Sequence, residues 1–326
     1  MTDLIAADIG GTNARFARAT LDASGVPTLG EGRKYKVADY PSLAACWQHF
    51  KADELAKGGG DLPDAASIAF AAPIAQETIK LTNSSWSIRP AHLAQDLGLA
   101  NVRLVNDFEA VAHAVARLPE DSLQLLFGPD APFPHDGGVT VLGPGTGLGV
   151  ALIAFDEGVP HILATEGGHT DFAPLDGLES QILDQLRREY RRVSTERICA
   201  GPGLNNLYKA LATITHEKVE LLSDADLWAA ALDGSNALAR TALERFCLSL
   251  GSVAGDLAVA HGPHGVVLAG DLIHRLRDFL VEESGFHSRF IAKGRYEALM
   301  RTIPIRMAIH PNIGLFGAAA AYRETR

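Results

Sequence analysis

Two segments of the sequence share one plan, in which an apolar strand is followed by a glycine-rich turn and a second apolar strand. The first segment is AADIGGTNARFA at residues 6–17, and the second is VTVLGPGTGLGVALIAF at residues 139–155. Glycine-rich turns between apolar runs predict β-hairpins. Because the unit occurs near the N-terminus and again after a proline- and glycine-rich loop at 128–138, the sequence predicts a duplicated architecture.

Asp8 is the residue that a simple hairpin does not explain. Acidic side chains are depleted in strands, yet Asp8 ends the apolar run LIAAD at residues 4–8. A carboxylate beside a phosphate-binding turn can hold Mg²⁺, usually through water, because this ion gives up its hydration shell reluctantly. The residue types also allow a structural role, in which Asp8 caps the turn through an Asx hydrogen bond.

The spacing of the glycines excludes two common nucleotide-binding motifs. No GxxxxGK[ST] string occurs, and GPGTGLG has its glycines at every second position rather than in the GxGxxG pattern. Both turns still suit phosphate, because glycine leaves backbone N–H groups unobstructed. Thr12, Asn13 and Thr146 could add side-chain donors. The alternative is that each turn only closes its hairpin.

The rest of the chain alternates between predicted strands and helices. Apolar runs predict strands over 14–21, 66–73, 102–107 and 265–272. Helical spacing predicts helices over 42–57, 90–97, 107–118 and 314–324, and a mostly helical region from 177 to 260. This order indicates an α/β fold with mixed sheets.

Charge and cysteine usage narrow the class of protein. The net charge is −10, and the densest basic run, at 187–192, has the pattern of a solvated helix face, so we expect no nucleic-acid partner. The three cysteines are far apart, which argues against a disulfide framework or a structural zinc. The N-terminus lacks a signal-peptide pattern, and no apolar run approaches the ~20 residues of a membrane span. We therefore expect a cytoplasmic protein without a membrane partner.

Several longer motifs resemble one family. AADIGGTNARF, LVNDFEAVAHAV, VLGPGTGLGV, TEGGHTDFAP and STERICAGPGLNNLY, followed by GFHSRFIAKGRY and PNIGLFGAAAAY, closely resemble the bacterial glucokinase family in the same order. This resemblance implies the two-domain actin-like ATPase (ribonuclease H-like) fold, with a duplicated core and a cleft between a small and a large α/β domain. The small domain would comprise residues 1–109 with 311–326, and the large domain residues 110–310.

The resemblance also implies an activity, its substrates and an assembly. The expected reaction is the ATP-dependent phosphorylation of D-glucose to glucose 6-phosphate, the first step of glucose use in glycolysis, with ATP and Mg²⁺ as cofactors. The expected assembly is a homodimer. A related group of sugar kinases and regulators carries a cysteine-rich zinc motif, which three scattered cysteines cannot build.

Asp107 matches the catalytic aspartate of the family. It stands where a predicted strand meets a predicted helix, and a helix N-terminus favours the ionised form that a base requires. The structural alternative is that Asn106 or Asp107 only caps this helix. The substrate-binding residues that the resemblance implies are Asn83, Asn106, Asp107, Glu166, His169 and Glu196.

Other positions near the sugar are implied less directly. Pro73, with Asn83, corresponds to the small-domain wall of the cleft, and Asp171 corresponds to a residue behind the sugar contacts. In TEGGHTDF, two glycines would let the backbone approach the ligand. The alternative for Glu196 is a helix-end ion pair with Arg197.

The nucleotide positions implied by the resemblance lie in three segments. They are Ala7, Asp8, Ile9, Gly10, Gly11 and Thr12; Gly143, Gly145, Thr146 and Gly147; and Gly270. The resemblance implies that Asp8 organises Mg²⁺ through water. Asp271 departs from the family, which usually has a second glycine there, so the choice of ATP over other phosphoryl donors stays open. A kinase for another or a broader set of hexoses, and a catalytically silent sugar-sensing protein, are the alternative functions.

Overall fold

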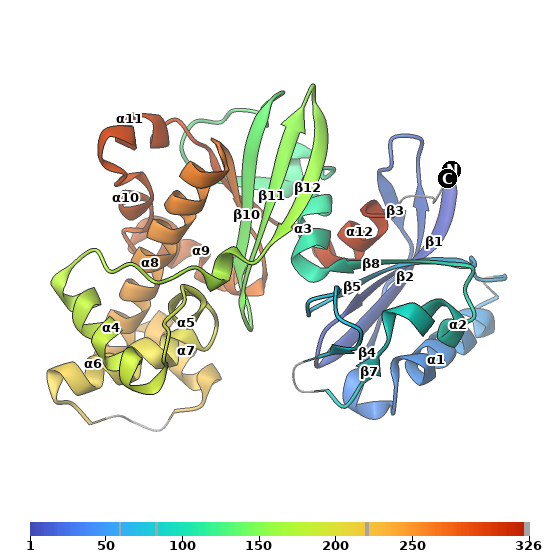
Figure 1. Ribbon diagram of the computed structural model, residues 1–326, viewed down its shortest axis with the longest axis horizontal. Coiled ribbons are helices and arrows are strands. Elements are labelled where there is room, and N and C mark those ends of the chain that lie inside the picture. The colour runs from blue at the N-terminus through green and yellow to red at the C-terminus, as the bar shows by residue number, and fades with distance from the viewer. Residues whose placement is uncertain (59, 82–83, 219–221, 323–326) are drawn as a thin grey trace. The chain divides into compact units, whose positions relative to one another are not determined.

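The computed structural model describes residues 1–58, 60–81, 84–218 and 222–322. The chain divides into two compact units (Figure 1). Unit 1 consists of Met1–Pro119 with the C-terminal segment that begins at His310, and unit 2 consists of Glu120–Ile309.

Unit 1 is built on a mixed six-stranded sheet in the order β3-β2-β1-β5-β8, with β4 paired to β2. The strands are β1 (Thr2–Ile9), β2 (Asn13–Leu21), β3 (Pro27–Leu29), β4 (Arg33–Lys36), β5 (Ala65–Phe70) and β8 (Asn101–Asn106). The antiparallel hairpin of β1 and β2 confirms the prediction, and β5 and β8 run parallel to β1. The short strands β6 (Ile79–Lys80) and β7 (Ser87–Ile88) pair separately.

Helices cover both faces of this sheet (Figure 1). They are α1 (Leu43–Ala56), α2 (Leu93–Leu97), α3 (Asp107–Val115) and α12 (Ile313–Ala320). Alternate residues of β1 enter different cores: Ile5 and Ile9 pack with α1 and α2, whereas Leu4 and Ala6 pack with α3 and α12. Because side chains alternate along a strand, Asp8 belongs to the face covered by α12.

Several predicted elements of unit 1 are shorter in the structure, among them the helices predicted over 107–118 and 314–324, which end at Val115 and Ala320. The strand predicted to reach residue 73 ends at Phe70, where its neighbours β1 and β8 also end. The helix predicted over 90–97 is α-helical only from Leu93, after a 3₁₀ turn at Pro90–His92.

The first boundary of the compact units falls after Pro119, whereas the sequence analysis placed it after residue 109. The physical reason is the contact of α3 with α12. A Cβ atom on Gly317 would lie 1.8 Å from the carbonyl oxygen of Ala110, so the two helix backbones touch. Residues 110–119 therefore belong to unit 1.

Unit 2 repeats the sheet plan of unit 1. Its sheet has the order β12-β11-β10-β13-β14-β9. The strands are β9 (Leu123–Phe127), β10 (Gly137–Pro144), β11 (Leu148–Asp156), β12 (Val159–Thr165), β13 (Pro263–Leu268) and β14 (Ile305–Ala308). An antiparallel meander, β10-β11-β12, is followed by parallel strands β13 and β14, just as β1-β2-β3 is followed by β5 and β8. The predicted duplication is confirmed.

The region predicted to be mostly helical forms the body of unit 2. Its helices are α4 (Gly177–Glu189), α5 (Glu196–Cys199), α6 (Gly203–Thr215), α7 (Asp224–Asp233) and α8 (Ala237–His261). Three more follow: α9 (Asp271–Glu282), α10 (Phe286–Ile291) and α11 (Glu297–Met300). In Figure 1 they lie to one side of β10–β12, and the long helix α8 is buried among them.

Candidate functional site

Asp8 lies near the end of β1 and is paired with the neighbouring strand. Its Oδ2 is 3.0 Å from Nη1 of Arg15, which is also its partner in the register of β1 and β2. A Cβ atom on Gly314 would lie 2.7 Å from the same oxygen, so the carboxylate rests against the first turn of α12. The positive end of that helix dipole favours a negative charge at this position.

The two glycine turns use their first glycine in the same way. In the turn after β1, Gly10 N donates to Asn13 O at 2.9 Å, and in the turn after β10, Gly145 N donates to Gly147 O at 2.7 Å. Within the described ranges, the next two N–H groups of each turn donate to no protein group. These groups belong to Gly11, Thr12, Thr146 and Gly147. Each turn thus presents two adjacent donors, an arrangement that suits a phosphate oxygen.

The other nucleotide positions of these segments lie inside strands. The side chains of Ala7 and Ile9 are buried in the core shared with α1 and α2. Gly143 pairs with Gly149 inside the β10–β11 ladder. These three residues can therefore offer only backbone atoms to a ligand.

Asn106 caps α3. Its Oδ1 accepts hydrogen bonds from Phe108 N at 2.9 Å and Glu109 N at 3.4 Å, and the Glu109 side chain completes a capping box. Its Nδ2 donates to Ala72 O at 3.4 Å. Asn106 therefore caps the helix, which is the structural role considered for it. The second hydrogen of its Nδ2 could be donated to a sugar hydroxyl.

Asp107 is the first residue of α3, and its Oδ1 accepts from Phe108 N at 2.9 Å. The parallel strands β1, β5 and β8 end together in register, so Asp8 and Asp107 lie at the same edge of the unit 1 sheet. Pro73 is exposed in the turn that follows β5. Asn83 lies outside the described residues.

In unit 2, Glu196 lies on the second glycine turn. It is the first residue of α5, and its Oε2 accepts from Leu148 N at 3.0 Å. A Cβ atom on Gly147 would lie 2.5 Å from that oxygen. The guanidinium group of Arg197 instead stacks on the ring of Tyr190, 4.2 Å from its centroid. The structure therefore contradicts the alternative of an ion pair between Glu196 and Arg197.

Glu166 and His169 are neighbours on the surface after β12. His169 N donates to Glu166 O at 2.9 Å, and the side-chain atoms Oε2 and Nε2 are 3.9 Å apart. Both side chains are exposed, by 71% and 57% respectively. They can therefore meet a ligand without any rearrangement of the core.

The two glycines between Glu166 and His169 serve packing in this structure. A Cβ atom on Gly168 would lie 2.2 Å from Leu148 O, and one on Gly167 would lie 3.0 Å from the Val150 side chain. The backbone at these two glycines therefore comes close to β11. The sequence analysis expected such an approach to a ligand. Because Glu196 holds Leu148 N and Gly168 packs on Leu148 O, the predicted sugar-binding residues of unit 2 gather at the start of β11.

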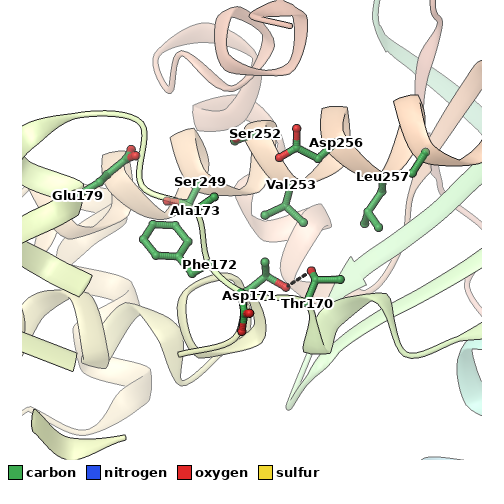
Figure 2. Close-up of a pocket in the computed structure, with 12 residues that line it drawn as sticks. Thr170, Asp171, Phe172, Ala173, Glu179, Ser249, Ser252, Val253, Asp256 and Leu257 are labelled. Atoms are coloured by element: carbon green, nitrogen blue, oxygen red, sulfur yellow. Dashed lines mark hydrogen bonds between the residues drawn. The ribbon is translucent and has the colours of Figure 1, made fainter. Parts of the chain in front are cut away.

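A cavity of about 260 Å³ lies between the segment that follows His169 and helix α8 (Figure 2). Figure 2 shows Thr170, Phe172 and Ala173 on one side, and Ser249, Val253 and Asp256 of α8 on the other. Asp171 is ion-paired with Arg192, whose Nε lies 2.6 Å from Oδ1. The carboxylate of Asp171 is thus directed to a neighbouring cation. Its place behind the sugar contacts stays a prediction.

The late glycine turn follows β13. Gly270 has φ = 103°, which favours glycine, and its Cβ would lie 3.6 Å from Pro144 O. This turn therefore lies beside the end of β10. Asp271 is exposed at the first position of α9.

Among the described residues, the acidic side chains do not form a dedicated metal cage. Across the described ranges, no group of three or more His, Cys, Asp or Glu side chains could hold a metal ion. A single carboxylate such as Asp8 suits a Mg²⁺ ion that keeps its water and takes its other ligands from phosphates. Over the same ranges, no helix combines the length and apolar character needed to cross a membrane.

Known proteins resemble this chain over nearly its whole length. The family model of glucokinase matches residues 5–325. The chain is 50% identical to a glucokinase of Zymomonas mobilis subsp. mobilis over 98% of this chain and 97% of that protein. It is 41% identical to a glucokinase of Caulobacter sp. over 96% of this chain and 93% of that protein.

Solved structures give the same picture of the fold. The crystal structure of a glucokinase from an Antarctic psychrotroph is 32% identical, with a TM-score of 0.84 and 98% of both chains covered. A ROK family glucokinase from Streptomyces griseus, in complex with glucose and AMPPNP, is 20% identical, with a TM-score of 0.61 over 99% of this chain and 100% of that chain. At that identity the likeness concerns the fold alone.

Proposed function

This chain belongs to the glucokinase family, and we propose that it transfers the γ-phosphoryl group of ATP to the 6-hydroxyl group of D-glucose. The products are glucose 6-phosphate and ADP. The glucokinases that resemble the chain over nearly its full length support the reaction. The Streptomyces griseus enzyme, bound to glucose and the ATP analogue AMPPNP, supports the choice of substrates. Mg²⁺ would enter with the nucleotide as Mg-ATP.

The observation that carries the proposal is the position of Asp107 at the start of a capped helix. The capping box of Asn106 fixes the backbone there, and a helix N-terminus favours the ionised form of a carboxylate. In the proposed step, the oxygen of the glucose 6-hydroxyl forms a bond to the γ-phosphorus, and the bond from that phosphorus to the bridging oxygen of ADP breaks. The hydroxyl proton passes to the Asp107 carboxylate.

The other residues have binding roles in this proposal. Asn106, Glu166, His169 and Glu196 would bind glucose hydroxyls, since carboxylates accept hydrogen bonds and an amide can also donate. The paired N–H groups of the two glycine turns would receive phosphate oxygens. Gly270 would lie beside the adenosine, and Asp8 would orient the metal-bound phosphates. These proposed binding groups belong partly to unit 1 and partly to unit 2, and we propose that the two compact units are the functional domains.

The test of the catalytic role compares Asp107→Ala with Asp96→Ala, which changes an exposed aspartate of α2. Formation of ADP is measured with glucose and Mg-ATP, and folding is checked by circular dichroism. We expect Asp107→Ala to lower kcat by at least about 10²-fold, because it removes the general base. The control should keep wild-type turnover.

Two results would contradict parts of the proposal. If folded Asp107→Ala keeps its turnover, the base has been assigned to the wrong residue. If the wild-type protein binds glucose but forms no ADP, the protein is a sugar sensor and the reaction itself is wrong. For an active enzyme, turnover measured with a panel of hexoses, each with ATP, GTP or polyphosphate, ranks the sugars and the phosphoryl donors.

The family membership also supports two broader proposals. We propose a homodimer, which light scattering would reveal as twice the mass of one chain. We also propose that the enzyme works in the cytoplasm, where glucose and ATP are both available, and cell fractionation followed by an activity assay tests this.

A further inference from the structure

Glu196 connects the proposed sugar site to the second glycine turn of unit 2. Its Oε2 accepts the hydrogen bond of Leu148 N at 3.0 Å, and Gly147 leaves room for this oxygen because it has no side chain. The carbonyl group of Gly145 is held from the same side, by Gly201 N at 2.7 Å. The segment from 196 to 201 therefore holds the turn at both of its ends.

The same segment also holds the loop that carries Glu166 and His169. Thr195, which precedes Glu196, donates through Oγ1 to Gly168 O at 2.7 Å and through its backbone N–H to Thr170 O at 2.8 Å. The backbone of Gly168 in turn packs on Leu148 O. The Leu148 residue is thus fixed at its nitrogen by Glu196 and at its oxygen by the sugar-binding loop.

We propose that Glu196 is a positioning residue for the nucleotide, in addition to its proposed contact with glucose. Its carboxylate occupies Leu148 N–H and leaves the N–H groups of Thr146 and Gly147 directed to the triphosphate. A carboxylate beside a phosphate site is otherwise unfavourable, because like charges repel. The hydrogen bond to Leu148 gives a reason for its presence there. This inference rests on the proposed function, in which this turn binds ATP.

The test measures the affinity for AMPPNP by titration calorimetry in the absence of glucose. We expect Glu196→Ala to weaken binding about tenfold or more, because the turn loses a charged hydrogen-bond acceptor. Glu196→Gln should stay within about threefold of wild type, since its Oε1 can still accept from Leu148 N–H. Glu217→Ala, at an exposed site after α6, is the control and should bind as wild type does. A residue that only contacts sugar would not change this affinity.

A second set of variants tests the contact directly. Gly147→Ala places a Cβ atom 2.5 Å from Glu196 Oε2 and should displace the carboxylate, whereas Gly177→Ala adds a methyl group in open space. We expect Gly147→Ala to weaken AMPPNP binding in the wild-type background, and to add little once Glu196 is alanine. Additive effects of the two substitutions, or unchanged affinity in Glu196→Ala, would overturn the positioning role. Failure of the wild-type protein to bind AMPPNP would instead contradict the proposed function.

Discussion

The carboxylate of Asp8 lies against Gly314, although these residues come from opposite ends of the chain. A Cβ atom at position 314 would lie 2.7 Å from Oδ2 and 2.8 Å from Cγ of Asp8. The acid that looked misplaced in an apolar strand thus faces the N-terminal turn of α12 and pairs with Arg15. Its position is set by α12, the last helix in the sequence.

We therefore predict that Gly314→Ala impairs the use of Mg-ATP. The added methyl group must displace the Asp8 carboxylate from its place beside the first glycine turn, so kcat/KM for Mg-ATP should fall about tenfold or more. The stability should change by less than about 1 kcal/mol, because alanine also favours the helix. Steady-state kinetics at saturating glucose gives the first value and urea denaturation the second.

Gly32→Ala is the matched control for this prediction. It places a Cβ atom 3.5 Å from Leu315 Cδ1, an ordinary van der Waals contact with the same helix. Wild-type kcat/KM in Gly314→Ala would show that the position of the Asp8 carboxylate has no effect on nucleotide use.

Asn106→Ala should lower stability through the loss of a helix cap. Removal of the Oδ1 acceptor leaves Glu109 N without its capping partner and takes one of two acceptors from Phe108 N, at a cost of about 0.5–2 kcal/mol. Asn106→Asp keeps this acceptor and should recover most of the loss in urea denaturation. Equal destabilisation by both substitutions would show that the cap contributes nothing, and that the contact of Nδ2 with Ala72 O matters instead.

The duplicated sheet could be predicted from the sequence because its signals are local. Each glycine turn stands between apolar runs, and both predicted hairpins are present. Within these two sheets, the sequence analysis missed β3, β4, β9, β12 and β14. In β14, Arg306 interrupts the apolar run, yet it is 8% exposed and its Nη2 binds Asp130 Oδ1 at 2.8 Å. A partner so distant in the chain cannot be recognised from a short window.

Candidate residues for the site could be proposed from the sequence, but the contacts that hold them could not. Family motifs pointed to Asp8, Asp107 and Glu196. The neighbours that hold them were missed, because Gly314 and Leu148 carry no chemically active side chain. Their backbone atoms, brought close by packing, position the carboxylates. In both cases a glycine lies so close to the carboxylate that a Cβ atom would clash with it. This closeness identifies the residues that position the carboxylate, and only a structure reveals it.

Ser249 and Ser284 should respond in opposite ways to replacement by alanine. Both are buried in unit 2, with 2% and 4% exposure, but Ser249 Oγ has no hydrogen-bond partner among the described residues, although it lines the cavity of Figure 2. Ser284 Oγ donates to Leu280 O at 2.7 Å and accepts from Phe286 N at 3.2 Å. Ser249→Ala should be neutral or stabilising, whereas Ser284→Ala should cost about 1–3 kcal/mol in urea denaturation. A loss of that size in Ser249→Ala would mean that its hydroxyl group has a partner, such as a bound water.

His261 should make stability depend on pH near neutrality. Its Nδ1 lies 3.0 Å from Thr140 Oγ1 of β10, and burial lowers the pKa of its imidazole below the ordinary value of 6.5. The unfolded chain therefore binds a proton more readily than the folded chain, so the stabilisation is complete above pH 6.5 and is lost as the pH falls toward the folded pKa. Burial likewise lowers the pKa values of His287 and His310, which adds to the trend.

The prediction for His261 is measured as the free energy of unfolding in urea at pH 7.5 and pH 5.5. The wild-type protein should be less stable at the lower pH, and His261→Gln should lose less stability between these two values. His92→Gln, at an exposed position, is the control and should keep the wild-type difference. If His261→Gln shows the full wild-type difference, the partly buried imidazole does not contribute, and other groups must bind the protons that destabilise the folded chain.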